Sequence, residues 1–383
     1  MECLVHRVPM RDPGDVTALL RLIDEGLIAA HKIVAILGKT EGNGCVNDFS
    51  RGYATMAVSV ALAKRLGIGA EEVTSRVAIV MSGGTEGGLS PHFLVFAVRE
   101  HGNLPGRGKS LAVGTASTPA LLPEQIGRTP QVELTAGAVR EAVEHAAITD
   151  DADVHWVQIK CPLLTSERIA DAVARGATVA TGDTYASMAL SRAAAALGVA
   201  VALGEVDPAM LNDQAIGHDF DLWSTRASAS AGIELMHNEI IVLGNSAAWS
   251  SDSVIAHGVM RDAIDLPNVI DVLRRLDFTI AAQLDEVAAT RVLAVLAKAE
   301  ASRSGTIRGA RHIMSDDSDI QASRHARAGR RRARRRHRPH RPVRLGRRRA
   351  PGTRRRWTHR SDRPPSLLNS GTLARQLLAP DQR

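Results

Sequence analysis

One order of features occurs three times along the chain, and this internal repeat limits the folds that the chain can adopt. Each copy has an apolar strand ending in Lys, then a helix carrying Ser-Arg; in the first two copies a second strand then leads to a small-residue turn beginning with Ser. The recurring positions are Lys39, Arg51 and Ser82 in the first copy, Lys160, Arg192 and Ser230 in the second, and Lys298 and Arg324 in the third. Alternating strands and helices are typical of α/β folds. The repeat therefore predicts three similar α/β modules around a pseudo-threefold axis, with these side chains in one central cleft.

The copies also set the expected module boundaries. We expect the first module over residues 1–105, the second over 112–250 and a partial third over 251–328. An Arg-rich tail, expected to be disordered, then occupies residues 329–383. A chain of 383 residues has room for two or three domains at about 150 residues each.

Charge is divided unevenly between this tail and the rest of the chain. The whole sequence has a formal net charge of +7, but residues 329–383 hold 19 Arg, no Lys and two acidic residues. The preceding part has 29 basic and 39 acidic residues and is therefore acidic. Clustered Arg can bind nucleic acid by neutralising phosphates, which leaves a nucleic-acid-binding protein as one alternative. Specific recognition is not favoured, because the tail has no aromatic side chains interleaved with its Arg apart from Trp357.

Other classes of protein are excluded or disfavoured by simple patterns. No stretch reaches the roughly 20 uninterrupted apolar residues of a membrane span, and the first residues lack the apolar core of a signal peptide. We therefore expect a cytoplasmic protein. Three cysteines without CxxC spacing, Cys3, Cys45 and Cys161, indicate neither a disulfide framework nor a zinc cluster. A single Lys at a strand end is usually solvated, but three in register favour a shared site.

Several long strings of residues resemble one enzyme family. These are GKTEGNGCVNDFSRG, MSGGTEGGLSPH, VQIKCPLL, ASASAGIEL, IAHGVM and AKAEAS. The chain resembles the ring-opening amidohydrolases, the family of cyanuric acid hydrolase and barbiturase, from residue 1 to about 328. The resemblance implies three structurally similar modules with a Ser-Lys dyad in each, an active site between them, and a homotetramer. No organic cofactor is expected.

The resemblance also implies an activity and roles for individual residues. Cyanuric acid would be opened by hydrolysis to carboxybiuret, which loses carbon dioxide to give biuret in s-triazine degradation; barbiturate is the alternative substrate. Ser230 would be the nucleophile and Lys160 the general base, with Lys39 and Lys298 in supporting roles. Because a free Lys has a pKa near 10.4, this role requires burial and neighbouring Arg side chains to lower the pKa of Lys160.

The chemistry of the ring matches the repeat. Cyanuric acid alternates C=O and N–H with threefold symmetry, so three guanidinium groups can each face one carbonyl, a geometry that Lys does not reproduce. The expected substrate-binding positions are Arg51, Ser82, Gly83, Arg192, Ser230, Ala231 and Arg324. Ile320 lies four residues before Arg324 and, on a helix, would share its face as a wall selecting the substrate.

The third module departs from the family pattern in its last part. The family implies a third Ser turn resembling SGGAEHQGPDGGGP, which brings a loop that binds a structural Mg²⁺ or Ca²⁺. Of those ligands, this chain retains Glu300 alone. Reading one base further along permits the family turn in order over Leu345–Thr358, and a frame change would also explain an excess of Arg over Lys. We therefore infer a frameshift near Ala328 and expect the chain as printed to be poorly stable or inactive.

Overall fold

The computed structural model describes residues 1–83, 90–100, 108–262, 264–297, 306–311 and 376–380. Two compact units are present, one of residues 1–299 with 372–383 and one of residues 300–371. In the second unit, the described residues form an antiparallel pair of short strands, β11 (Thr306–Ile307) and β12 (Ala310–Arg311). All other elements belong to the first unit.

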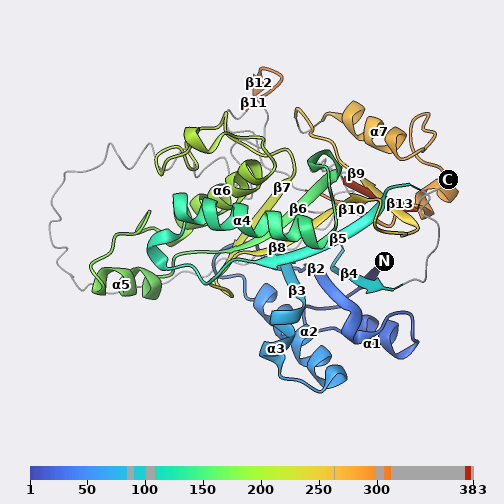
Figure 1. The fold of residues 1–383 in the computed structure, drawn as a ribbon, viewed down its shortest axis with the longest axis horizontal. Coiled ribbons are helices and arrows are strands. Elements are labelled where there is room, and N and C mark those ends of the chain that lie inside the picture. Colours follow the sequence, from blue (N-terminus) through green and yellow to red (C-terminus); the bar gives the residue numbers. More distant parts are fainter. Residues whose placement is uncertain (84–89, 101–107, 263, 298–305, 312–375, 381–383) are drawn as a thin grey trace, which may run out of the picture. The chain divides into compact units, whose positions relative to one another are not determined.

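The first module is a four-stranded sheet with three helices (Figure 1). Its elements in chain order are β1 (Glu2–Pro9), α1 (Thr17–Asp24), β2 (Ile33–Lys39), α2 (Ser50–Leu66), α3 (Ala70–Arg76), β3 (Ala78–Ser82) and β4 (His92–Arg99). The spatial order of strands is β1-β4-β2-β3. Strands β2 and β3 are parallel, whereas β4 runs antiparallel to β1 and β2. A parallel pair needs a long crossover, which α2 and α3 provide.

The second module has the same topology. Its elements are β5 (Ser110–Ser117), α4 (Thr129–His145), β6 (Val154–Pro162), α5 (Ser166–Ala174), α6 (Thr184–Ala202), β7 (Ala227–Gly232) and β8 (Glu239–Ser246). Its strands follow the order β5-β8-β6-β7, with β6 parallel to β7 and antiparallel to β8. The repeat in the sequence thus corresponds to two α/β modules of one topology.

The third module retains part of this plan. Strand β9 (Ser253–Ala256) is followed by α7 (Leu266–Arg275), α8 (Glu286–Thr290) and β10 (Ala294–Leu296). Strand β13 (Gln376–Pro380) lies between β9 and β10 and pairs antiparallel with both, in the position that β4 and β8 hold in the other sheets. The sequence predicts disorder throughout the tail, so this strand corrects the prediction at residues 376–380. The physical reason is that the backbone groups of β9 and β10 need a partner strand.

Both faces of the first sheet are buried, and the alternation of its side chains decides what each face contacts. Ile36 and Phe93 pack in a core with the helices of the first module. Leu37, Val80 and Phe96, on the opposite face, join a core shared with the second sheet. Side chains alternate with a period of two along a strand. Lys39 and Ser82, two residues after Leu37 and Val80, therefore lie on the face directed at the second module.

The second sheet is covered on its other side by two helices. Helix α4 packs on β5 and β8, α6 packs on β6 and β7, and the two helices pack on each other. Helix α6 begins after Asp183, whose carboxylate accepts hydrogen bonds from the backbone N–H groups of Tyr185 and Ala186. By length and composition α6 could cross a membrane, but more than half of its apolar stretch is buried inside this fold. Packing against both a helix and a sheet accounts for its apolar sequence.

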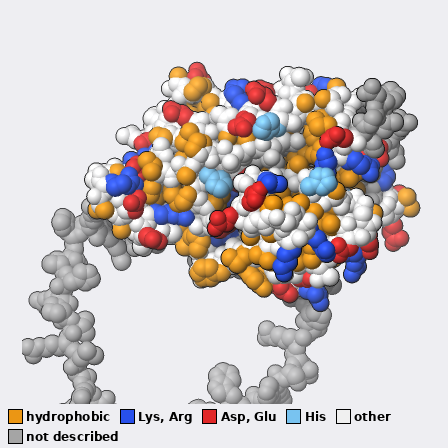
Figure 2. Space-filling model, turned by 60° about the horizontal axis from the view of Figure 1, so that its bottom comes forward, with side chains coloured by type: hydrophobic (Ala, Val, Ile, Leu, Met, Phe, Trp, Pro, Cys, Tyr) orange, Lys and Arg blue, Asp and Glu red, His pale blue; other side chains and the backbone are white. Residues whose placement is uncertain are grey.

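Apolar side chains also reach the surface, among charged ones, on the face shown in Figure 2. Helix α2 and the residue before it expose a row at helical spacing, namely Phe49, Tyr53, Met56 and Val60. Its opposite side buries Ala54, Val58 and Leu62 in the core of the first module. Helix α2 is therefore apolar on both sides, and only one of them is covered by the first module.

We expect substitution by Ala to have opposite effects on stability at two glycines of the second module. A Cβ at Gly114 on β5 would lie 1.9 Å from the backbone oxygen of Ala142 on α4, whereas a Cβ at Gly137, also on α4, would meet nothing within 4 Å. We expect Gly114→Ala to lower the free energy of unfolding by about 1–3 kcal/mol through overpacking. Gly137→Ala should raise it by up to about 1 kcal/mol, because Ala is the better helix former. Urea unfolding measures both, and equal effects of the two changes would contradict this packing.

Candidate active site

Each complete sheet pairs a Lys with a Ser where its two parallel strands end. Lys39 at the end of β2 is the register partner of Ser82 on β3, and Lys160 on β6 is the register partner of Ser230 on β7. Register partners on neighbouring strands point to the same face and lie about 5 Å apart. The two modules thus build the same Lys-Ser pair by the same topology. In the third module Lys298 lies outside the described residues.

Lys160 is buried, with 2% of its surface exposed. Its Nζ donates a hydrogen bond of 2.9 Å to the backbone oxygen of Met81 on β3. The same atom forms an ion pair, also 2.9 Å long, with Oε1 of Glu234. Burial lowers the pKa of Lys160 below its ordinary value, the charge of Glu234 opposes this, and the nearby Arg51 adds to the lowering. A lowered pKa is what a lysine requires in order to act as a base.

The hydroxyl of Ser230 is the reactive group expected in the second pair. Its Oγ is buried and has no hydrogen-bond partner among the residues that the structure describes. Buried polar atoms are nearly always hydrogen-bonded, so an exception needs an explanation, and a catalytic role is one. In the first module, Ser82 Oγ is 3.5 Å from the oxygen of Gly83, and Lys39 Nζ is 3.4 Å from that same oxygen. Lys39 is also only half-buried, so the second pair is the more strongly desolvated one.

Arg51 connects the first module to the Ser turn of the second. It lies on α2 with 2% of its surface exposed. Its Nη1 donates to the backbone oxygen of Ala231 at 3.0 Å, and its Nη2 donates to that of Cys45 at 2.9 Å. These two bonds use only part of the guanidinium, which has five N–H donors, and the ring-facing role expected for Arg51 stays a prediction. The bond to Ala231 places the guanidinium next to the residue that follows Ser230.

The crossing contacts run in both directions between the two modules. Arg51 of the first module binds the turn that carries Ser230, and Lys160 of the second module binds the strand residue just before Ser82. The site is therefore assembled by both modules, as the repeat predicts for side chains that converge.

Removal of the Arg51 guanidinium should weaken this assembly. We expect Arg51→Met to lower the free energy of unfolding by about 2–5 kcal/mol, because it leaves two buried carbonyls without their donor and the buried carboxylate of Asp48 without its ion-pair partner. Arg65→Met is the matched control: Arg65 pairs with Asp24 at the surface, where such a pair contributes about 0–1 kcal/mol. Urea unfolding of both variants is the measurement. Equal losses would show that the contact between modules adds nothing.

Asp48 is a site residue that the sequence analysis missed. It is 5% exposed, its carboxylate accepts from the backbone N–H groups of Gly44 and Ser50, and it lies 3.7 Å from Nε of Arg51. A Cβ at Gly83 would lie 1.8 Å from Oδ2 of Asp48, so the turn after Ser82 needs glycine for this close approach. An Asp side chain commonly accepts from the backbone N–H two residues further on, as Asp48 does from Ser50, and this local pattern could have pointed to it.

Glu234 is the second residue that the sequence analysis missed. Its carboxylate folds over the backbone of Gly232, where a Cβ would lie 2.0 Å from Oε2. Burial disfavours its ionised form, but the Lys160 charge prevails and the pKa of Glu234 is lower than usual. Its position in ASASAGIEL, four residues after Ser230, is only a weak sequence signal for a site residue.

The remaining predicted residues are placed as follows. Arg192 lies on α6, where its Nε donates to the oxygen of Met188. Burial raises the pKa of the neighbouring Tyr185 to about 12; Cys45 contributes to the increase and the Arg192 charge opposes it. The loop that contacts Arg51 through Cys45 therefore also reaches the surroundings of Arg192. Four predicted residues lie outside the described part of the chain, namely Lys298, Glu300, Ile320 and Arg324.

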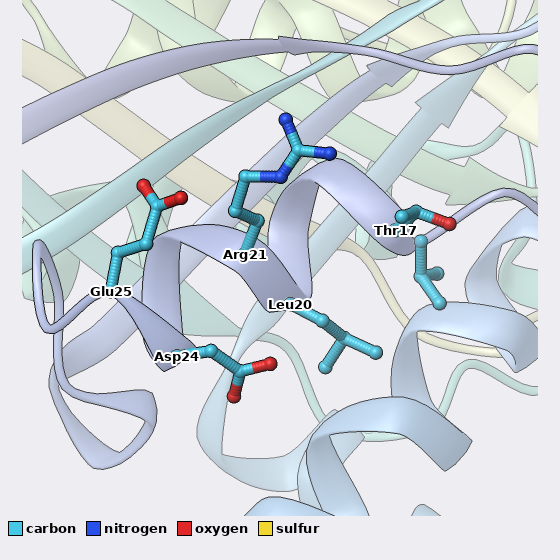
Figure 3. Close-up of a pocket in the computed structure, with 6 residues that line it drawn as sticks. Thr17, Leu20, Arg21, Asp24 and Glu25 are labelled. Carbon is cyan, nitrogen blue, oxygen red and sulfur yellow. The ribbon is translucent and has the colours of Figure 1, made fainter.

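A separate pocket lies along α1 (Figure 3). Its lining consists of Val16, Thr17, Leu20, Arg21, Asp24 and Glu25. These residues include none of the recurring Lys, Arg or Ser positions. Among the described residues, no group of three or more His, Cys, Asp or Glu could hold a metal ion.

Comparisons with known proteins add to this geometry. A family model described as amidohydrolase ring-opening protein matches residues 4–330. A cyanuric acid amidohydrolase of Enterobacter cloacae is 54% identical over 333 residues, covering 86% of this chain and 90% of the relative. The enzyme of that name from Azorhizobium caulinodans is 54% identical over 324 residues, covering 85% and 87%.

Solved structures match the fold as well. One, described as cyanuric acid hydrolase and evolutionary innovation by structural concatenation, has a TM-score of 0.79 at 49% identity and covers 85% of this chain and 89% of the other. The hydrolase structure from A. caulinodans has a TM-score of 0.75 at 54% identity and covers 85% and 88%. The expectation of an α/β fold made of concatenated similar modules is confirmed.

Proposed function

Because the chain belongs to the family of ring-opening amidohydrolases, we propose that it hydrolyses a cyclic amide, cyanuric acid, with Ser230 as nucleophile. The observation that carries this proposal is the buried Oγ of Ser230, which has no partner within the described part of the chain and lies in register with the buried Lys160. The curated relatives named above support the choice of cyanuric acid over barbiturate.

The proposed reaction uses the groups already in place. Lys160 as the neutral amine takes the proton of Ser230, and Oγ forms a bond to one ring carbonyl carbon. The ring C–N bond then breaks, and the departing nitrogen takes the proton from Lys160. Water hydrolyses the resulting acyl-enzyme, which releases carboxybiuret and restores the Ser230 hydroxyl. Decarboxylation of this product gives biuret.

The surroundings of Ser230 favour these steps. A serine hydroxyl is a weak nucleophile until an adjacent base accepts its proton, and Lys160 is held on the neighbouring strand at the same level. Donors fixed in a dry site stabilise a developing oxyanion strongly, because they need no reorganisation during the reaction. We propose that the backbone N–H groups after Ser230 and the guanidinium groups of Arg51 and Arg192 have this role.

Other implied properties remain predictions. In the third module, Glu300 would hold a structural divalent cation, but it lies outside the described residues and no step is assigned to the ion. The homotetramer, the cytoplasmic location and the absence of an organic cofactor also remain predictions.

The proposal is tested by measuring biuret released from cyanuric acid, with barbiturate assayed in parallel. Both the chain as printed and a version with the reading frame restored after Ala328 are to be used. Turnover of cyanuric acid by either version supports the proposal. Turnover of barbiturate alone would assign the alternative substrate, and inactivity of both versions as folded proteins would refute the proposal.

A further inference from the structure

Lys160 has a carboxylate partner whose effect opposes the lowering of its pKa by burial. Nζ of Lys160 lies 2.9 Å from Oε1 of Glu234, and the side chain of Glu234 is 18% exposed. An anion this close to a buried ammonium group favours the protonated form of the lysine. A general base, in contrast, must be neutral before it can accept a proton. The ion pair therefore bears directly on when Lys160 can act.

The remaining charges around Lys160 leave Glu234 as the residue that decides this balance. Arg51, from α2, acts on Lys160 in the opposite sense, and Cys161 next to it in the chain acts weakly in the same sense as Glu234. Glu239 on β8 is in register with Lys160, but its carboxylate is bonded to His237 at 3.1 Å. The ion pair of Lys160 is with Glu234, and not with the carboxylate beside it in the sheet.

The position of Glu234 is fixed by the turn that also carries Ser230. The carboxylate lies over Gly232, where a Cβ would be 2.0 Å from Oε2. Lys160 is held from its other side by the backbone oxygen of Met81. The amino group thus has two fixed acceptors, one neutral on the first module and one charged on the second.

We propose that Glu234 is a positioning residue for Lys160: its carboxylate holds the amino group in place beside Ser230 and keeps it protonated over part of the pH range. This inference rests on the proposed role of Lys160 as the base. It adds that the pair, and not Lys160 alone, sets the pH above which the neutral amine is available.

The test follows the ionisation of Lys160 directly and needs no substrate. The chain contains six lysines, so ¹³Cε-labelled lysine gives few signals, and the one absent from Lys160→Met identifies Lys160. We expect Glu234→Gln to move the titration midpoint of Lys160 down by about 1–3 pH units, because the stabilising anion is lost. Glu239→Gln is the matched control and should leave the titration midpoint of Lys160 within about 0.3 pH units. A typical ion pair shifts a pKa by about one unit or more. An unchanged or raised midpoint in Glu234→Gln would overturn the proposal.

A thermal-unfolding cycle keeps the proposal testable if Glu234→Gln folds poorly. Loss of one partner leaves a buried charge unpaired, whereas loss of both does not. We therefore expect Glu234→Gln to lower the Tm and the double variant with Lys160→Met to recover at least half of that loss. Additive losses would mean that Glu234 supports the fold without acting on Lys160.

The outcome for the hydrolase is separable from these measurements. In an active chain, the acidic limb of the pH profile of kcat/KM should move to lower pH in Glu234→Gln, and Glu234→Asp should return it toward its original position. A shifted NMR midpoint in a folded, frame-restored chain without turnover would support the ion pair and refute the proposed function. Normal turnover with an unshifted midpoint would support the proposed function and refute the proposed role of Glu234.

Discussion

Restoring the reading frame after Ala328 is expected to convert a chain with little or no turnover of cyanuric acid into an active hydrolase. The match to the family ends at residue 330, and the Arg-rich sequence follows directly. The first two modules contact each other through Arg51 and Lys160. A third module completed by its own strand and Ser turn would supply contacts of the same kind. We expect the rate of biuret release to rise by at least about 10³-fold, the scale on which loss of a transition-state donor set acts.

The same comparison should be visible in stability. Strand β13 fills the place of β4 and β8 from a distant part of the chain, whereas the restored sequence would supply this strand in its usual order. The Tm of the restored chain should therefore be higher. A printed chain that matches the restored one in both Tm and turnover would show that the third module needs no repair. Sequencing of the gene across the codons for Ser323 to Arg360 settles independently which frame is real.

Ser230→Ala in the restored chain is expected to reduce kcat by about 10³-fold or more, because it removes the nucleophile and leaves only binding and oxyanion stabilisation. Ser82→Ala is the matched control, since Ser82 occupies the same register position in the first module. We expect Ser82→Ala to act mainly on KM, with a far smaller effect on kcat. Steady-state kinetics at saturating cyanuric acid measures both changes. A larger loss of kcat in Ser82→Ala would move the nucleophile to the first module.

The asymmetry between the two pairs gives the physical reason for choosing Ser230. Both pairs have the same topology, but Lys160 is 2% exposed and Ser230 Oγ is buried without a partner among the described residues. Lys39 is half-buried and is therefore less desolvated than Lys160. Desolvation lowers the pKa of a lysine, so the buried member is the better base.

Much of the fold was predictable because it depends on local patterns. The repeated order of an apolar strand ending in Lys, a Ser-Arg helix and a second strand predicted similar α/β modules, and the sheets β1-β4-β2-β3 and β5-β8-β6-β7 do share one topology. The convergence of Lys160, Ser230 and Arg51 followed from the repeat alone. The strand β13 could not be predicted, because its partners lie more than 75 residues away and no periodicity marks it.

The parts of the site that were missed depend on the reach of side chains across turns. Glu234 follows β7, and only the path of the chain after Gly232 brings its carboxylate back to Lys160. The contacts of Arg51 with the oxygens of Cys45 and Ala231 were not predicted either. No spacing in the sequence encodes which backbone oxygen an arginine will reach.

The exchange of contacts between the first two modules has a consequence for how this chain is made. During synthesis the first module emerges with Arg51 and Ser82, but the turn that Arg51 binds and the lysine that binds beside Ser82 are translated later. A nascent or truncated chain with one module thus holds no finished reaction centre. Chemical competence appears only when the modules have docked, so turnover itself reports that the polypeptide has reached its final arrangement.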